Sequence, residues 1–259
     1  MGTNNESKLN RLFSLQPPGV VLQSDWLVAQ GYSHDLQQRY KKGNWLTPIG
    51  TGAFIRASEP VSYEGAVYAL QNQSKLSIHP GGRTALSLLG KAHYLELAPT
   101  HVFLFGYSNE KLPAWFRKRE WHEKIIYYPT SFLPMDVGLT SIEMKSLQIV
   151  VSNAPRALME CLYLAPDKQD LQECYELMEG LNGLVPKQVQ LLLEVCNSVK
   201  VKRLFVYMAE KAGHQWFKYL NIERVNFGIG VRSIVKNGIY VDKYKITVPK
   251  EFEQNASKL

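Results

Sequence analysis

Residues 24–56 read SDWLVAQGYSHDLQQRYKKGNWLTPIGTGAFIR, and they predict two short helices followed by a hairpin. Ser24 can cap the first helix, and Gly31 can end it because glycine adopts a left-handed backbone without a Cβ clash. Ser33 can cap the second helix, which stops at Gly43. This order of caps and breaks is typical of a helix-turn-helix.

The second predicted helix has one apolar side and one polar side. Leu36 and Tyr40 lie four residues apart, so we expect both to be buried. The other side is polar or basic and comprises His34, Gln37, Gln38, Arg39, Lys41 and Lys42. Glutamine amides can bind adenine through two hydrogen bonds, and lysines attract phosphate or contact guanine. This side suits a DNA major groove, although a helix with several cations can also be simply a solvated surface.

The residues after this helix predict a wing. Residues 45–49 and 53–57 alternate as strands do, and Gly50-Thr51-Gly52 supplies the backbone freedom of a hairpin turn. Arg56, on the returning strand, could reach a DNA phosphate. Upstream, residues 1–15 predict an amphipathic helix that braces this motif from behind.

The chain of 259 residues is long enough for a small domain and a larger one. We expect an α+β protein: a winged-helix region with a helical extension over residues 1–95 (core 20–58), then a mixed α/β domain over 96–259 with a linker near 108–124. The net charge of +7 and the pI of about 9.2 suit an anionic partner without naming one.

Local patterns predict the elements of the C-terminal part. Helices are expected at 155–164, 167–178, 186–195 and 199–211, and strands at 93–97, 101–105, 125–128 and 147–152. Asn237-Gly238 predicts a type I′ hairpin between 232–235 and 240–248. The basic aromatic segment KLPAWFRKREWHE (111–123) could stack its rings on bases or pack them on a neighbouring domain.

Catalytic chemistry has weak signatures here. Glu143-x-Lys145 is half of a nuclease motif, but Asp136 stands only seven residues upstream of Glu143, which is short for two paired strands. The three cysteines form no CxxC pair and the six histidines are scattered, so we expect reduced thiols and neither metal nor cofactor. Neither a membrane-length apolar run nor a signal-peptide core is visible, which favours the cytoplasm. We predict a binding protein rather than an enzyme.

Several blocks of sequence resemble the AbiEi antitoxins of type IV toxin–antitoxin systems, in the subgroup with an N-terminal winged helix. They are, in family order, WLVAQG (26–31) with Ser33, GNWLTPIGTGAF, YEGAVYALQ, IHPGGRTALSLLGKAHYL, LFGYSNEKLPAWF, VSNAPRALMECLYLAP, VKRLFVYMAEKAGHQWFKYL and IVKNGIYVDKYKITVP. The resemblance implies a bacterial winged-helix protein that represses its own operon at inverted repeats. It also implies a C-terminal domain that neutralises a nucleotidyltransferase toxin without a stable complex.

The resemblance also places the DNA contacts at Ser33, His34, Gln37, Gln38, Arg39, Lys41, Lys42 and Arg56. Charge alone suggests Arg156, Lys202, Arg203 and Lys218 as candidates in the antitoxin domain. Arg156 could instead form an i,i+4 ion pair with Glu160. The alternative function is a stand-alone winged-helix regulator whose C-terminal domain senses a ligand or a partner.

Overall fold

The computed structural model describes residues 8–91, 100–144 and 146–254, which form two compact units. The first unit comprises Met1–His79, Pro99–Pro129 and Ser141–Val151, and the second comprises Pro80–Ala98, Thr130–Thr140 and Ser152–Leu259. The chain therefore passes between the units several times, whereas the sequence suggested one division near residue 95. Local patterns show where elements begin and end, but they do not show which distant segments return to complete a unit.

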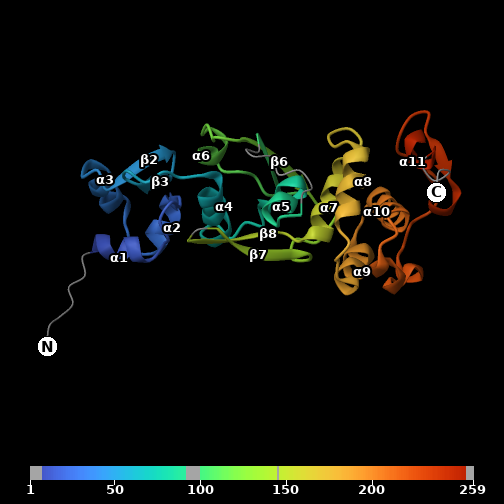
Figure 1. Ribbon diagram of the computed structural model, residues 1–259. Helices are drawn as coiled ribbons and strands as arrows, with labels where there is room; N and C mark the ends of the chain where they lie inside the picture. The colour runs from blue at the N-terminus through green and yellow to red at the C-terminus, as the bar shows by residue number, and fades with distance from the viewer. Residues whose placement is uncertain (1–7, 92–99, 145, 255–259) are drawn as a thin grey trace. The chain divides into compact units, whose positions relative to one another are not determined.

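The first unit begins with a winged helix, drawn in blue in Figure 1. Its elements are α1 (Lys8–Ser14), β1 (Leu22–Gln23), α2 (Ser24–Ala29), α3 (His34–Lys42), β2 (Leu46–Gly50) and β3 (Ala53–Arg56). The three strands form an antiparallel sheet in the order β1-β3-β2, in which Leu22 pairs with Phe54 and Leu46 with Arg56. The predicted helix-turn-helix and wing are confirmed.

The core of the winged helix explains why α1 is present. Leu12 of α1 is buried in a cluster with Leu22, Leu27 and Leu46, which come from the sheet and from α2. The predicted brace therefore exists. Burying a leucine side chain contributes about 1.5–3 kcal/mol, so this contact ties the N-terminal helix to the helix-turn-helix and the sheet.

Further helices and strands complete the first unit. They include α4 (Tyr63–Asn72), β5 (His101–Tyr107), α6 (Ala114–Arg117) and β6 (Lys124–Thr130), with β5 between β4 (His79–Pro80) and β6 in one sheet. Of these, α4, β5 and α6 contribute to one hydrophobic cluster with Ala53 of the wing. Strands β7 (Leu139–Met144) and β8 (Leu147–Ser152) pair with each other. The strand expected at 93–97 lies outside the described residues.

The candidate linker at 108–124 contains α6 and belongs to the packed first unit. Trp115 and Phe116 are buried in a cluster that also holds Ala53 of the wing and Leu70 of α4. Their rings are therefore core residues and are not available to stack on bases. The wing approaches closely here, because a Cβ at Gly50 would lie 2.8 Å from the Cβ of Trp115.

The second unit is mainly helical, and its helices from α7 onward are yellow to red in Figure 1. The helix α7 (Ala154–Leu164) lies at the centre of this unit. It packs against four other helices: α5 (Gly82–Leu88), α8 (Leu171–Gly180), α9 (Pro186–Val195) and α10 (Val199–Lys211). Pro155 and Pro186 stand in the first turns of α7 and α9, where the missing N–H costs no hydrogen bond. The described residues thus combine helices with small sheets, and the α+β class is confirmed.

The last part of the chain differs from the prediction. It contains η1 (Gln215–Tyr219), η2 (Ile222–Arg224), β9 (Arg232–Ser233), β10 (Ile239–Val241), η3 (Asp242–Tyr244), β11 (Ile246–Val248) and α11 (Lys250–Gln254). Strand β11 pairs antiparallel with β10 and parallel with β9, so the predicted hairpin between 232–235 and 240–248 is wrong. The reason is that η3 and the left-handed Lys245 (φ +50°) break the run 240–248 into two strands.

Candidate DNA-binding surface

One side of α3 is exposed and carries most of the predicted DNA contacts. Successive helical residues turn by about 100°, so His34, Gln38 and Lys41 fall in one line, Lys42 lies beside it, and Arg39 lies about 100° around the helix from Gln38. All five side chains are exposed, and we call them the α3 face. Their amide and guanidinium groups can donate to base edges, and their ammonium groups can contact phosphates.

Ser33 and Gly43 set the ends of this helix. The Oγ of Ser33 accepts a hydrogen bond of 3.4 Å from the backbone N–H of Leu36, which satisfies a free donor of the first turn. The backbone N–H of Gly43 donates to the carbonyl of Arg39. Ser33 is thus a cap that positions the α3 face, as the sequence predicted.

Gln37 points toward α2 and is buried. Its Nε2 donates to the carbonyls of Ser24 (3.1 Å) and Tyr32 (2.8 Å), and its Oε1 accepts from the Oγ of Ser24 (2.6 Å). Every one of these bonds links α3 to α2 or to the turn between them. The expectation that Gln37 contacts bases is therefore corrected, because its amide is already used to hold the helix pair together.

Arg56 also faces inward. Its Nη2 donates to the carbonyls of Phe13 (2.6 Å) and Gln16, and its Nη1 lies 3.5 Å from a carboxylate oxygen of Glu59. The guanidinium stacks over the Phe13 ring at 4.8 Å. Arg56 thus fastens the end of α1 and the segment after it to the wing, and we withdraw it from the set of phosphate contacts.

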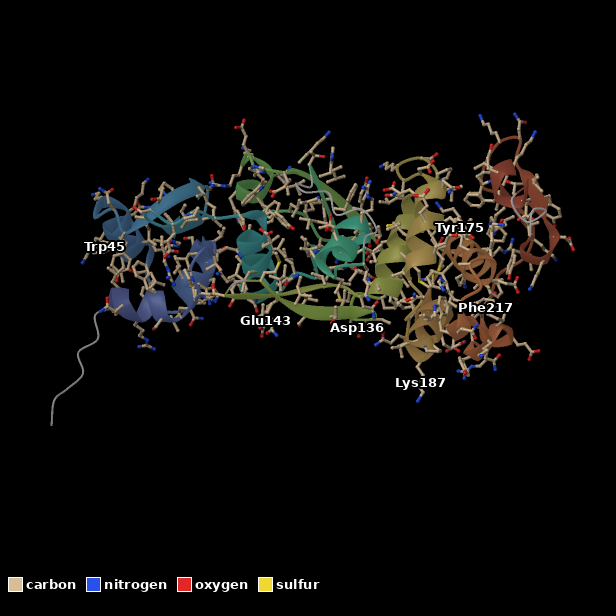
Figure 2. The ribbon with its side chains drawn as sticks, viewed as in Figure 1. Trp45, Asp136, Glu143, Tyr175, Lys187 and Phe217 are labelled. Atoms are coloured by element: carbon tan, nitrogen blue, oxygen red, sulfur yellow. The ribbon has the colours of Figure 1, made fainter. Side chains whose placement is uncertain are left out.

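Trp45 is a surface residue that the sequence analysis treated only as part of a strand. Its side chain is 51% exposed between the end of α3 and the start of β2 (Figure 2). A Cβ at Gly43 would lie 3.0 Å from Trp45 Cδ1, so the indole rests against a glycine backbone. The sequence does contain a sign of this placement, the Gly43-Asn44 turn directly before Trp45. A turn there holds the ring next to α3 rather than in a core.

Comparisons with known proteins agree with this geometry. A family described as "Transcriptional regulator, AbiEi antitoxin, Type IV TA system" matches residues 99–249. A second, described as "Transcriptional regulator, AbiEi antitoxin N-terminal domain", matches residues 5–97. The chain belongs to the AbiEi antitoxin family. The resemblance seen in the sequence blocks is thereby confirmed.

Solved structures add evidence on the fold. The RV2827C protein from Mycobacterium tuberculosis superposes with a TM-score of 0.59 over 97% of this chain and 94% of its own, at 10% sequence identity. At this identity the likeness supports the AbiEi chain's fold alone. A search among curated proteins found no match.

The four basic candidates in the second unit of this AbiEi protein are placed differently from one another. Arg156 is buried: its Nε bonds to Glu160 Oε1 at 2.9 Å and its Nη1 donates to the carbonyls of Pro134 (2.7 Å) and Val137. The alternative i,i+4 ion pair is therefore confirmed. Arg156 holds the 130–140 segment on α7 and is not a surface contact.

Lys202 and Arg203 are also buried, in α10. Only Lys218 of these four candidates is exposed, where its Nζ donates to Gln215 Oε1 and lies 5.3 Å from the ring centre of Tyr219. Periodicity could have indicated this outcome, because α10 is nearly all apolar around Lys202 and Arg203 (VKVKRLFVYM). We therefore remove Arg156, Lys202 and Arg203 from the surface candidates.

The other chemical motifs gain no support as sites. Asp136 and Glu143 are exposed and belong to different compact units, and Lys145 lies outside the described residues. Within the described ranges, three or more His, Cys, Asp or Glu side chains do not gather in a way that could hold a metal ion. Helices of bilayer-spanning length and apolarity are likewise absent from the part of the chain that the structure describes.

Proposed function

We propose that this chain is a type IV antitoxin that represses its own operon by binding inverted-repeat DNA through its winged helix. The observation that carries the proposal is the α3 face, in which five exposed polar or basic side chains stand on the second helix of a helix-turn-helix. Membership of a family of antitoxin transcriptional regulators supports the same function. The family is described by regulation and not by catalysis, which favours a protein that is no enzyme.

The residues of the α3 face have separate roles in this proposal. In the major groove, Gln38 can bind adenine through its amide and Arg39 can bind guanine through its guanidinium. Lys41 and Lys42 follow toward the end of the helix, where they would neutralise phosphates. Trp45 would pack its exposed ring against the sugar-phosphate backbone beside the wing. Two copies on one inverted repeat would double these contacts.

In the second unit we propose the toxin-neutralising function. The partner would be a nucleotidyltransferase-like toxin, and the contact would be transient rather than a stable complex. Lys218 is the one of the four original basic candidates that is exposed enough to meet such a partner. Neither function calls for a metal or an organic cofactor.

A footprint on the DNA upstream of the chain's own gene tests the repressor function. Purified protein should protect an inverted repeat in the presence of competitor DNA. The variant Gln38→Ala should retain general DNA affinity but lose about 1–3 kcal/mol of discrimination between the operator and random DNA. Unpatterned protection by the wild-type protein would contradict the proposal.

The antitoxin function is tested separately by co-expression. We expect a neighbouring reading frame to encode a nucleotidyltransferase-like protein that arrests growth, and this chain should restore growth. A variant that no longer binds DNA should still restore growth when both genes are driven by unrelated promoters. If the chain has no effect on the arrest while it still protects the operator, it is a stand-alone regulator.

A further inference from the structure

A buried arginine of α10 holds an exposed loop in the second unit. The guanidinium of Arg203 donates to the carbonyls of Phe227 (3.0 Å), Gly228 (3.2 Å) and Gly230 (2.7 Å). It also donates to the carbonyl of Lys245 (3.0 Å), just before β11. A planar guanidinium with five donors is suited to fixing several carbonyls at once. Arg203 therefore determines the backbone path of the loop.

A second arginine, the exposed Arg232, contacts the remaining carbonyls of the loop. The Nη1 of Arg232 lies within hydrogen-bond distance of the carbonyls of Ile229 (3.3 Å) and Val231 (3.1 Å). Five successive carbonyls, from residue 227 to residue 231, thus accept from two guanidiniums. At the start of the loop, the N–H of Gly228 donates to Asn226 Oδ1 (2.8 Å). The backbone is therefore fixed even though it lies at the surface.

The side chain that this loop presents is Ile229, which is 90% exposed. Single exposed apolar residues are common on protein surfaces and by themselves mean little. Here, however, the loop has a specific backbone conformation. The flanking Gly228 and Gly230 have left-handed φ values of +62° and +74°, and the buried Arg203 donates hydrogen bonds to the loop. A loop that is already ordered loses little conformational entropy when it binds, so its apolar tip is a good anchor for a partner.

The surroundings of Ile229 indicate the chemistry of that partner. Arg232 and Lys245 are both exposed, and they are brought together because Arg232 pairs in register with Ile246. A partner should therefore offer an apolar pocket with carboxylates at its rim. A second copy of this chain fits poorly, because each copy carries a net charge of +7.

We infer that Ile229 is the anchor through which the second unit contacts the cognate toxin, an inference that rests on the proposed antitoxin function. A single anchor with a charged rim buries far less than the roughly 1,000 Å² of a stable interface, so the contact would be short-lived. Arg203 is a positioning residue in this arrangement, since it fixes the loop but is itself buried.

Three variants in the co-expression assay test this inference. Ile229→Asp places a carboxylate at the anchor, Ile229→Leu keeps it apolar, and Leu191→Asp makes the same kind of change at a 49% exposed position on α9. Loss of an anchor residue typically weakens binding by about 30-fold. Ile229→Asp should therefore need about 30-fold more protein to restore growth, whereas the other two should match the wild type. Operator binding should be the same in all three.

A photo-cross-linker at position 229, compared with one at position 191, identifies the occupant. The expected product joins position 229 to the toxin. A product with a second copy of this chain, or full rescue by Ile229→Asp, would overturn the inference while leaving the antitoxin function intact. If the wild-type chain itself does not restore growth, the proposed antitoxin function fails first and the inference falls with it.

Discussion

The hydroxyl of Ser24 donates a hydrogen bond of 2.6 Å to Gln37 Oε1, which joins the first turn of α2 to the inner side of α3. The amide nitrogen of Gln37 returns two bonds, to the carbonyls of Ser24 and Tyr32. These three bonds fix the orientation of α3 relative to α2. Of two adjacent glutamines, Gln37 therefore maintains the helix pair, whereas the side chain of Gln38 is exposed.

The two glutamines should respond differently to substitution. Gln37→Ala leaves buried backbone and hydroxyl groups without partners, and we expect it to lower the free energy of unfolding by about 1–3 kcal/mol. Gln38→Ala at the exposed neighbouring position should change it by less than about 0.5 kcal/mol. Urea unfolding of both variants measures the difference, and equal midpoints would contradict the assigned roles.

The buried ion pair of α7 predicts a large loss of stability. Glu160 also accepts from Ser152 Oγ and from the N–H of Gly82, so removing Arg156 leaves a carboxylate buried with part of its partners lost. Arg156→Ala should cost about 3–5 kcal/mol. The matched control is Arg224→Ala, which breaks an exposed pair with Glu194 and should cost at most about 1 kcal/mol.

The cysteines of the described chain should be unreactive in the folded protein. Cys161, Cys174 and Cys196 are free and buried, and burial raises the pKa of each thiol above its ordinary value. The thiolate is the reactive form, so both access and ionisation oppose reaction. A thiol reagent at pH 8 should label none of them until denaturant is added. Rapid labelling of the native protein would show that α7, α8 or the end of α9 opens readily.

Glu210 should add a pH-dependent contribution to stability. Burial alone would raise the pKa of its carboxyl, but hydrogen bonds from Lys243 and Tyr244 outweigh that effect and lower the pKa below its ordinary value. A group whose pKa is lower in the folded state stabilises the protein above its unfolded pKa, and this stabilisation is lost as the pH falls through the folded pKa. Glu210→Gln should therefore be less stable than the wild type at pH 6, with the gap closing below about pH 4.

Unfolding midpoints of the two proteins between pH 3 and pH 6 check this dependence. Glu223→Gln, at an exposed position on η2, serves as the control for removing one negative charge. A gap between Glu210→Gln and the wild type that stays constant with pH would assign the effect to lost packing instead of the charged hydrogen bonds.

Local signals in the sequence predicted most of the helical fold. The bounds of α9 and α10 agree with the prediction, since proline, serine caps and apolar periodicity act within a few residues. The Arg156–Glu160 pair was foreseen as an alternative for the same reason, because its partners are four residues apart on one helix. These features depend on neighbours along the chain.

The roles of the other basic residues depend on distant segments and could not be predicted. Arg56 is held by carbonyls 40 and 43 residues away, and Arg203 by carbonyls 24 to 42 residues away. The apolar neighbours of Arg203 along α10 indicate burial, but no local pattern shows which carbonyls it binds. For Trp45, an aromatic residue at the start of a strand suggests burial, and the Gly43-Asn44 turn before it is the one local sign that its ring is exposed.

The salt dependence of operator affinity tests the central claim, that the α3 face binds DNA, most directly. Each phosphate contact contributes about 0.9 to the slope of log affinity against log salt concentration, so Lys41→Ala/Lys42→Ala should reduce that slope by about 2 and weaken binding to all sequences. The control Lys187→Ala/Lys236→Ala removes the same charge from exposed sites of the second unit (Lys187 is labelled in Figure 2) and should leave the slope unchanged. Equal slopes for the wild type and the Lys41/Lys42 variant would contradict the claim.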